Sequence, residues 1–282
     1  MTNDPISHAA KLIASADAFL ITAGAGMGVD SGLPDFRGKE GFWEAYPALA
    51  RARIEFRSIA NAAAFKKNPR LAWGFYGHRL ELYRNTVPHA GFSILKEIAA
   101  GMPHGAFVIT SNVDGQFQKA GFEELRVLEV HGSIHRLQCC GPCRSTVWSA
   151  QDIEPTVDNA RCEWVGNNLP TCERCRKIAR PNILMFDDWA WNSVRTENQR
   201  TALEIWSSKS TRRVVIELGA GIDIPTIRHT SLAQGCPVIR INTRHAELPE
   251  GMGISLPMGA KAALSAIADE LRNIGWLGSR SD

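Results

Sequence analysis

The sequence has no long hydrophobic segment: no stretch reaches the roughly 18 apolar residues that suggest a membrane-spanning helix. It also has no strong excess of charge, because 32 Lys and Arg stand against 29 Asp and Glu and leave a net charge of +3. Nucleic-acid binding needs a concentrated basic face, so this balance disfavours nucleic acid as the main partner. The N-terminal residues show no basic stretch followed by an apolar one, so we expect no signal peptide and a cytoplasmic protein.

What is present is typical of a globular protein. Hydrophobic residues make up 44% and charged residues 22% of the 282 positions, which is enough for one large domain and a smaller one. The seven cysteines are an odd number in a chain that we expect to be cytosolic. Disulfides are therefore not expected, and metal binding or simple burial is the better interpretation.

Five short apolar runs each end in a small or polar turn. The first, 18–22, follows a segment with helical spacing, 6–15, and ends at a cluster of glycines. The other runs are 106–110 before Ser111 and Asn112, 125–130 before His131, 213–218 before Gly219, and 237–241 before Asn242. Continuous apolar strands that alternate with helical segments predict an α/β fold, with a Rossmann-like parallel sheet covered by helices on both faces. Ligands of such sheets bind beyond the carboxyl ends of the strands, so we expect these turns to meet in one crevice.

Two segments depart from this pattern. Residues 42–84 are rich in aromatic and basic residues and look helical, and residues 137–180 contain six of the seven cysteines. We interpret both as insertions that together form the smaller domain. The predicted division is a large domain of 1–41, 86–136 and 181–282, a helical insertion of 42–85, and a zinc-binding insertion of 137–180.

The glycines after the first run are Gly24, Gly26 and Gly28. Glycines between a strand and a helix let the backbone approach a pyrophosphate, and the start of a helix favours the anion. A dehydrogenase fingerprint, G-x-G-x-x-G, would place the third glycine where Val29 stands, so hydride transfer is disfavoured. For the glycines alone, a tight turn without a ligand remains the alternative.

Two C-x-x-C pairs, Cys140 with Cys143 and Cys172 with Cys175, predict a structural zinc site with four thiolate ligands. Such a closed site would staple the smaller domain and leave no open position for catalysis. Cys139 is the alternative to Cys140 as the first ligand. We expect Cys162 and Cys236 to lie outside the metal site.

Several motifs resemble those of the sirtuin family, in particular its bacterial-type members. The segment from residue 24 to 38 reads G-A-G-M-G-V-D-S-G-L-P-D-F-R-G, and T-S-N-V-D-G begins at Thr110. K-A-G follows at Lys119 and H-G-S at His131, and the resemblance extends from about residue 6 to 270. It implies that the large domain binds NAD, and that the chain is an NAD-consuming acyl-lysine deacylase, a transferase that releases nicotinamide and O-acyl-ADP-ribose from acyl-lysine protein substrates.

The resemblance also implies roles for individual residues. His131 would be the general base that activates a ribose hydroxyl, a step that suits a group titrating near neutral pH. Asn112 would order the water or ribose near the nicotinamide pocket, and Asp114 would hold that pocket. Phe36 would shield the reactive sugar carbon. The expected NAD-binding residues are Gly24, Ala25, Gly26, Asp35, Phe36, Arg37, Ser111, Asn112, Asp114, Gly219, Ala220, Gly221, Asn242, Gly259 and Ala260.

The chain departs from the family pattern at three places. Ser111 stands for the usual Gln, and the turn at 219–221 is G-A-G in place of G-T/S-S, which loses hydroxyl donors but keeps backbone N–H groups. The strand that resembles the substrate-docking segment carries Ile183, Met185 and Phe186, and Asp187 replaces a Gly there. This substitution adds negative charge where the substrate would enter.

Tyr76 and Arg79 are three residues apart in the helical insertion, so they share one helical face. A phenol and a guanidinium in one pocket would bind a carboxylate well. Sirtuins that remove succinyl and other acidic acyl groups carry a similar pair. A solvated Arg beside a core Tyr is the alternative.

Two other functions remain open from the sequence. A protein ADP-ribosyltransferase or NAD hydrolase on the same scaffold is compatible with Ser111 and Asp187, whereas His131 argues against it because deacylation needs that base. A non-catalytic, NAD-sensing binding module is the second alternative.

Overall fold

A computed structural model of the chain describes residues 4–34, 38–141, 143 and 146–278. Its large sheet has six parallel strands in the order β11-β10-β9-β1-β2-β3. The bounds are β1 Ala18–Ala23, β2 Ala106–Thr110, β3 Val127–Glu129, β9 Arg213–Leu218, β10 Val238–Ile241 and β11 Gly253–Leu256. All five apolar runs therefore contribute strands, although the third begins as a 3-10 turn, η2 Glu124–Arg126. The predicted α/β fold is confirmed.

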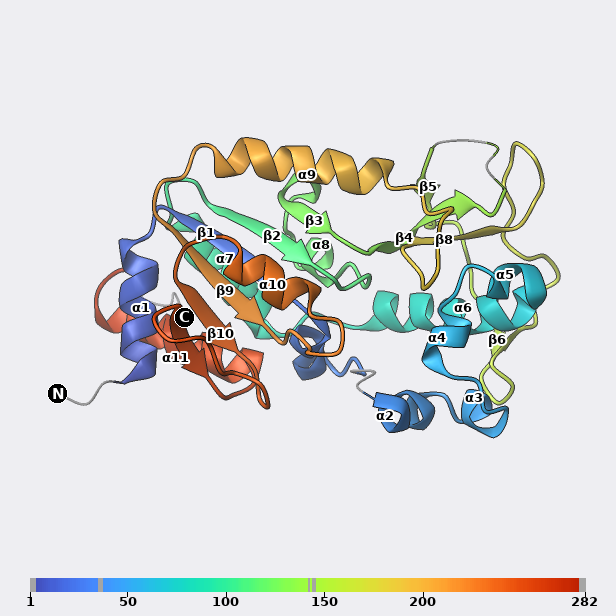
Figure 1. Cartoon of the computed structure of the whole chain (residues 1–282), viewed down its shortest axis with the longest axis horizontal. Helices are drawn as coiled ribbons and strands as arrows, with labels where there is room; N and C mark the ends of the chain where they lie inside the picture. The colour runs from blue at the N-terminus through green and yellow to red at the C-terminus, as the bar shows by residue number, and fades with distance from the viewer. Residues whose placement is uncertain (1–3, 35–37, 142, 144–145, 279–282) are drawn as a thin grey trace.

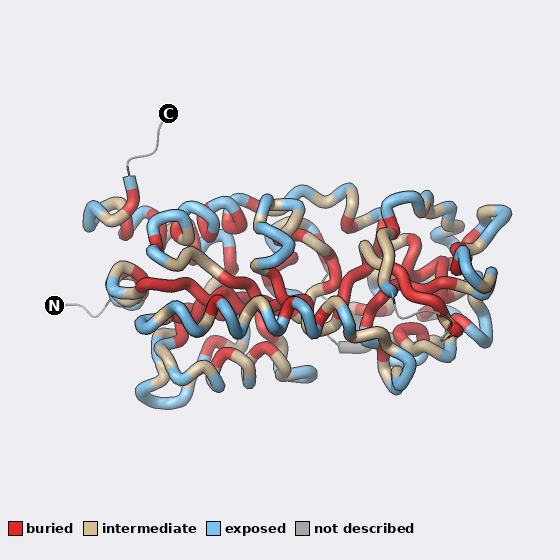
Figure 2. The backbone as a smooth tube through the Cα atoms, turned by 90° about the horizontal axis from the view of Figure 1, so that it is seen from above, coloured by how far each residue is buried: buried red, intermediate tan, exposed pale blue. Residues whose placement is uncertain are grey.

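The central strand β1 shows why the sheet needs helices on both faces. Phe19 and Ile21 pack into the core formed with α1 Pro5–Ser15, α7 Ala90–Ala100 and α11 Ala260–Asn273. The alternate residue, Leu20, packs into a second core that includes Trp206 of α9 Val194–Ser207 and Ile227 of α10 Thr226–Leu232. Successive side chains of a strand point to opposite faces, so an all-apolar strand requires a cover on each side. Figure 2 shows these buried strands as a red layer between exposed helices.

The other end of the molecule consists of four short helices, one long helix and small antiparallel sheets (Figure 1). The helices are α2 Gly38–Ala45, α3 Pro47–Arg51, α4 Phe56–Ile59, α5 Ala64–Lys67 and α6 Pro69–Asn85. A three-stranded sheet has the order β5-β4-β8, with β4 Gly132–Cys139, β5 Trp148–Ser149 and β8 Ala179–Ile183. A separate hairpin pairs β6 Val157–Asp158 with β7 Glu163–Trp164.

A third, aromatic-rich core holds this end together. It joins residues of the helical insertion, such as Trp73 and Phe75, to residues of the cysteine-rich insertion, such as Trp164. The two inserted segments therefore pack on one another, although they are far apart in the sequence. The exact domain bounds stay a prediction. Among the described residues, no helix is long and apolar enough to span a membrane.

Candidate active site

A cavity of about 430 Å³ lies between the carboxyl ends of strands of the large sheet and the part of the molecule that the two inserted segments form. Of the expected strand-end residues, Gly24, Ser111, His131 and Gly219 line it. Further predicted NAD-binding residues that line the cavity are Ala25, Asn112, Asp114 and Gly221. The structure thus brings together side chains and turns that the sequence spreads over nearly 200 positions.

The turn after β1 and the turn after β9 pack directly against each other. Gly219 has a φ of +59°, and a Cβ at this position would lie 2.3 Å from the carbonyl carbon of Gly26. The Gly26 N–H donates to the Gly219 carbonyl at 3.0 Å. Only glycine at 219 allows this contact, so Gly26 supports the crevice from behind rather than lining it.

Asn242 does not line the cavity either. Its Nδ2 donates to the Ala220 carbonyl at 2.9 Å, and its Oδ1 accepts from the Arg244 N–H at 3.1 Å. Asn242 therefore fixes the turn that follows β9. In the part of the chain that the structure describes, the N–H groups of Ala220 and Gly221 donate to no protein acceptor.

The remaining predicted NAD-binding residues fall elsewhere. Gly259 is the N-cap of α11 and neither it nor Ala260 lines the cavity. Asp35, Phe36 and Arg37 lie outside the described residues.

His131 is positioned by the two strands that connect the large sheet to the small one. It sits between β3 and β4, and its carbonyl accepts from the Leu184 N–H at 2.9 Å. The next residue, Gly132, has a φ of +76°, and a Cβ there would lie 2.0 Å from the Asn182 carbonyl oxygen. The glycine thus lets β4 approach β8 closely enough to hold the imidazole in the cavity.

Burial lowers the pKa of His131 below its ordinary value, and a hydrogen bond to the Ser111 backbone only partly opposes this effect. The ring is therefore neutral near pH 7 and can accept a proton, as a general base must.

Asn112 and Asp114 are fixed in the loop that follows β2. The Asn112 Nδ2 donates to the Gly24 carbonyl at 3.0 Å, which ties this loop to the glycine turn after β1. The Asp114 Oδ1 accepts the Gln116 N–H at 2.9 Å, at the start of α8 Gln116–Lys119. Burial raises the pKa of Asp114 to about 6, although Arg79 opposes the rise.

The helix α6 supplies one wall of the cavity. Tyr76, Arg79 and Tyr83 all line it. Arg79 is 8% exposed, which rules out the solvated arginine that was the alternative from sequence. Its Nε donates to the Tyr83 hydroxyl at 2.9 Å, and its guanidinium lies 5.3 Å from the centroid of the Phe75 ring. A buried cation therefore faces the same cavity as His131.

The docking segment forms an apolar wall. Ile183, Met185 and Phe186 line the cavity, and their role in binding the substrate stays a prediction. The Phe186 N–H donates to the Ala60 carbonyl at 3.0 Å, which joins this segment to the helical insertion. Asp187, with a φ of 53°, contacts Arg57 at 3.3 Å near the surface.

Sequence reasoning missed several lining residues. They were given no role from the sequence: Leu33, Pro34, Phe56, Ala60, Tyr83, Val113, Leu184, Asp223, Ile224 and Ile227. Leu33, Pro34 and Val113 lie inside the quoted motifs and could have been indicated by them. Phe56 and Ala60, in contrast, reach the cavity only through tertiary packing.

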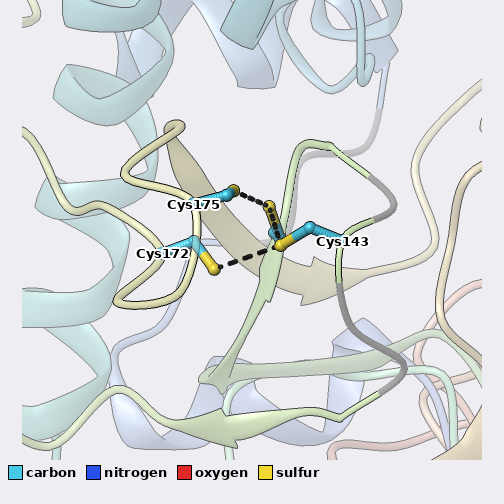
Figure 3. A group of neighbouring side chains, drawn as sticks. Cys143, Cys172 and Cys175 are labelled. Carbon is cyan, nitrogen blue, oxygen red and sulfur yellow. Dashed lines mark hydrogen bonds between the residues drawn. The ribbon is translucent and has the colours of Figure 1, made fainter.

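Four cysteine sulfurs cluster in the cysteine-rich insertion (Figure 3). They belong to Cys139, Cys143, Cys172 and Cys175 and lie within 4.8 Å of one another. Three of the sulfur–sulfur distances are 3.5 Å. Tetrahedral zinc with bonds of about 2.3 Å would space its sulfurs by about 3.8 Å, so the cluster fits a structural zinc.

The preference for Cys140 as the first ligand is wrong, because Cys139 takes that place in the cluster. Neighbouring side chains of an extended chain point to opposite sides, and Cys139 is the last residue of β4. The Cys140 side chain instead packs against the aromatic-rich core, and its N–H donates to the Ile178 carbonyl at 3.0 Å. Cys162 and Cys236 lie outside the cluster, as expected.

Comparison with known proteins places these features in a family context. A family model described as the Sir2 family matches residues 24–207. An NAD-dependent protein deacylase 2 from Pyrobaculum aerophilum is 29% identical over 268 residues, which cover 94% of this chain and 95% of the relative. An NAD-dependent protein deacylase from Pyrococcus furiosus is 27% identical, with coverage of 95% and 99%.

Solved structures share the fold. A Sir2 homologue in complex with NAD superposes with a TM-score of 0.71 at 23% identity, covering 94% of this chain and 93% of that one. A mutant Sir2 homologue in complex with ADP-ribose gives a TM-score of 0.70 at 23% identity, with coverage of 96% and 98%.

Proposed function

The chain belongs to the Sir2 family, and from this premise we infer that it is an NAD-dependent protein lysine deacylase that consumes NAD. The resemblance seen in the sequence motifs is thereby confirmed. One observation carries the inference: the neutral imidazole of His131 shares a cavity with the glycine turns on one side and with an apolar, cation-bearing wall on the other.

The glycine turns suit the diphosphate of NAD. The N–H groups of Ala220 and Gly221 have no acceptor among the described residues, and Gly221 has open space beside its Cα. Free N–H groups in a turn bind phosphate oxygens without the help of a side chain. This supports a role for the turn even though it lacks the hydroxyl groups usual in the family.

In the proposed reaction, NAD supplies the electrophilic sugar carbon and the acyl-lysine carbonyl attacks it. His131 takes the proton of a ribose hydroxyl, because its lowered pKa keeps the ring neutral. Asn112, fixed to the Gly24 carbonyl, orients the ribose or a water beside the nicotinamide. Asp114 holds the nicotinamide pocket from the same loop. The activated hydroxyl would attack the carbon of the imidate formed in the first step, and water would then release the lysine amine. One NAD, one acyl-lysine and one water thus give nicotinamide, O-acyl-ADP-ribose and free lysine.

The wall formed by α6 further supports an acidic acyl group, such as succinyl, as the preferred substrate. The Arg79 guanidinium is buried and held by the Tyr83 hydroxyl, and Tyr76 lies beside it on the same helix. A charge-assisted hydrogen bond from Arg79 would satisfy a carboxylate that enters the cavity. An acetyl group would leave this cation without an anionic partner from the substrate.

We propose acyl-lysine side chains of proteins as substrates and a cytoplasmic location. The four-thiolate cluster supports the location, because structural zinc needs reduced cysteines, which persist in reducing compartments.

Incubation with NAD and matched acetyl, succinyl and unmodified lysine peptides, followed by mass spectrometry of every product, tests the proposal. A deacylase yields acyl-ADP-ribose only with acylated peptides. ADP-ribose attached to protein would favour an ADP-ribosyltransferase, and free ADP-ribose without peptide would favour an NAD hydrolase. NAD binding with no product at all would favour a non-catalytic sensor.

A further inference from the structure

A second cavity, of about 540 Å³, adjoins the active-site cavity at Tyr83 and Asp114. These two residues line both cavities. No residue of the glycine turns at 24–26 and 219–221 lines the second one. Apart from Asp114, no residue assigned to NAD lines this second cavity.

Four Lys and Arg side chains line this second cavity, and each comes from a different element. They are Arg84 at the end of α6, Lys119 at the end of α8, Arg136 of β4 and Arg195 of α9. The carboxylates on the lining are those of Asp114 and Glu124. Convergence of four cations from four elements concentrates positive charge in a way that the nearly neutral chain as a whole does not.

Two of the cations are held by groups that do not neutralise them. The Arg84 Nη1 donates to the Ile153 carbonyl and the Lys119 Nζ donates to the Thr86 carbonyl, each at 2.6 Å. Carbonyl oxygens fix the positions of these side chains but leave their charges in place. Such preorganised cations favour a bound anion, because little side-chain freedom remains to be lost.

The other two cations, Arg136 and Arg195, share one acidic partner, Glu124. Glu124 contacts Arg136 at 3.2 Å and Arg195 at 2.6 Å, and buried Glu129 also contacts Arg195. The Arg195 side chain is only 14% exposed, and its Nη1 is buried with no hydrogen-bond partner among the described residues. This nitrogen is too deeply buried to meet a ligand in the cavity, so Arg195 contributes to the site through its charge.

One titratable ring in the cavity can report a bound anion. His135 lines the cavity, and its Nε2 lies 2.9 Å from the Asp114 carbonyl oxygen. Burial lowers the pKa of His135, the hydrogen bond to the Asp114 backbone opposes this fall, and the charges of Arg84, Arg136 and Lys119 lower the pKa further. Three lining cations thus disfavour a positive charge at this position.

We propose that this cavity is a binding site for a small phosphate-type dianion, either inorganic phosphate or the phosphate group of a small monoester. A tetrahedral oxyanion presents oxygens in several directions, which matches cations that approach from four elements. A single carboxylate is planar and presents its two oxygens on one side, which suits a single guanidinium better.

Calorimetric titration of the full-length protein at constant ionic strength tests the proposal with three probes: inorganic phosphate, glycerol phosphate and succinate. We expect saturable binding of at least one phosphate compound and weaker binding of succinate. Binding of glycerol phosphate in preference to phosphate would identify a monoester as the ligand, and the reverse order would identify the free ion. Succinate binding as tight as that of both phosphates and equally weakened by Lys119→Glu, or no saturable binding of phosphate, would overturn the proposal.

Variants that remove or reverse a lining charge locate the binding. Lys119→Glu and, separately, Arg136→Gln should each weaken phosphate binding by about tenfold or more, because each removes a charge-assisted contact. Lys209→Glu, at an exposed position beyond the end of α9, makes the same charge reversal as Lys119→Glu away from the cavity and should change nothing. Equal binding by all variants would place the phosphate elsewhere, at the glycine turns, and would overturn the assignment.

An NMR titration of the histidine ring protons gives a second readout. A dianion held beside the cations should raise the pKa of His135 in the wild type and leave it unchanged in the Lys119→Glu variant. No movement at saturating phosphate would contradict the site. Neither measurement needs NAD turnover, so the outcome is independent of whether the deacylase proposal holds.

Discussion

The Nε of Arg79 donates to the Tyr83 hydroxyl, four residues further along α6, at a distance of 2.9 Å. Both residues line the cavity that also contains His131. The tyrosine therefore holds a buried cation at a fixed place in the wall of the active site. This fixed cation predicts that the enzyme prefers acyl groups that carry a carboxylate.

Replacement of Arg79 by Met should lower kcat/KM for a succinyl-lysine peptide by about 10- to 100-fold, because a hydrogen bond to a charged group contributes about 1.5–3 kcal/mol. The value for the matched acetyl peptide should change much less. Arg70→Met, on the same helix but with its guanidinium bonded to the Trp164 carbonyl, is the control. A wild-type enzyme that strongly prefers the acetyl peptide, with no change in Arg79→Met, would end the acidic-acyl hypothesis.

The pH dependence of deacylation should follow the protonation of the His131 ring. Because burial lowers the pKa of His131 below its ordinary value of 6.5, kcat/KM should be constant near pH 7 and fall on the acid side with a midpoint below 6.5. An acetyl peptide should be used, since the acetyl group itself does not titrate. An acid limb centred above pH 6.5 would show that the ring is not held neutral in the way described.

Asp114 should lower the stability of the folded protein at neutral pH. Its pKa rises from 3.8 to about 6 on folding, so the folded state binds this proton more tightly than the unfolded chain. The group therefore favours folding below about pH 4, and that advantage is lost as the pH rises through 6. Asp114→Asn should be more stable than the wild type at pH 8 by about 1–3 kcal/mol, from about two pKa units at about 1.4 kcal/mol each, a net shift that already includes the attraction to Arg79.

Denaturant unfolding of both proteins at pH 4 and pH 8 measures this difference, and the gain should vanish at pH 4. The same substitution should reduce deacylation, because Asp114 lines the active-site cavity. A variant that is equally destabilised at both pH values would indicate a simple packing defect and contradict the burial argument.

The neighbouring cysteines Cys139 and Cys140 provide a matched pair for the metal site. Cys139→Ser should abolish zinc retention and lower the unfolding free energy by more than about 3 kcal/mol, a fall in Tm of roughly 6–12 °C. Cys140→Ser should keep one zinc per chain, because its sulfur lies outside the cluster. Zinc content by atomic absorption and thermal unfolding decide the matter, and loss of zinc only in Cys140→Ser would reverse the assignment.

The sequence predicted the parts of the fold that rest on continuous apolar runs. It missed β11, because Gly253–Leu256 is short, partly exposed and begins with a glycine. This strand exists through its pairing with β10, a contact that no local pattern reveals. Composition thus predicted a strand where the strand is buried, including the edge strand β3, but not at the partly exposed edge strand β11.

The site was predictable where a motif places a residue directly after a strand. His131 and Asn112 reach the cavity for this reason. Asn242 also follows a strand, yet its amide turns to the Ala220 carbonyl and supports the turn from behind. The C-x-x-C spacing predicted Cys140 as the first zinc ligand. In the structure the Cys139 side chain points toward the other three sulfurs, because neighbouring side chains at the end of β4 point to opposite sides. Sequence spacing alone does not show to which side a side chain points.

Nicotinamide exchange by the variant His131→Asn tests the central claim most directly. The base acts on a ribose hydroxyl after the bond to nicotinamide has broken, so the variant should still exchange labelled nicotinamide into NAD in the presence of acyl peptide. Its formation of acyl-ADP-ribose should fall by about 100- to 10,000-fold. Deacylation at the wild-type rate in His131→Asn would contradict the account.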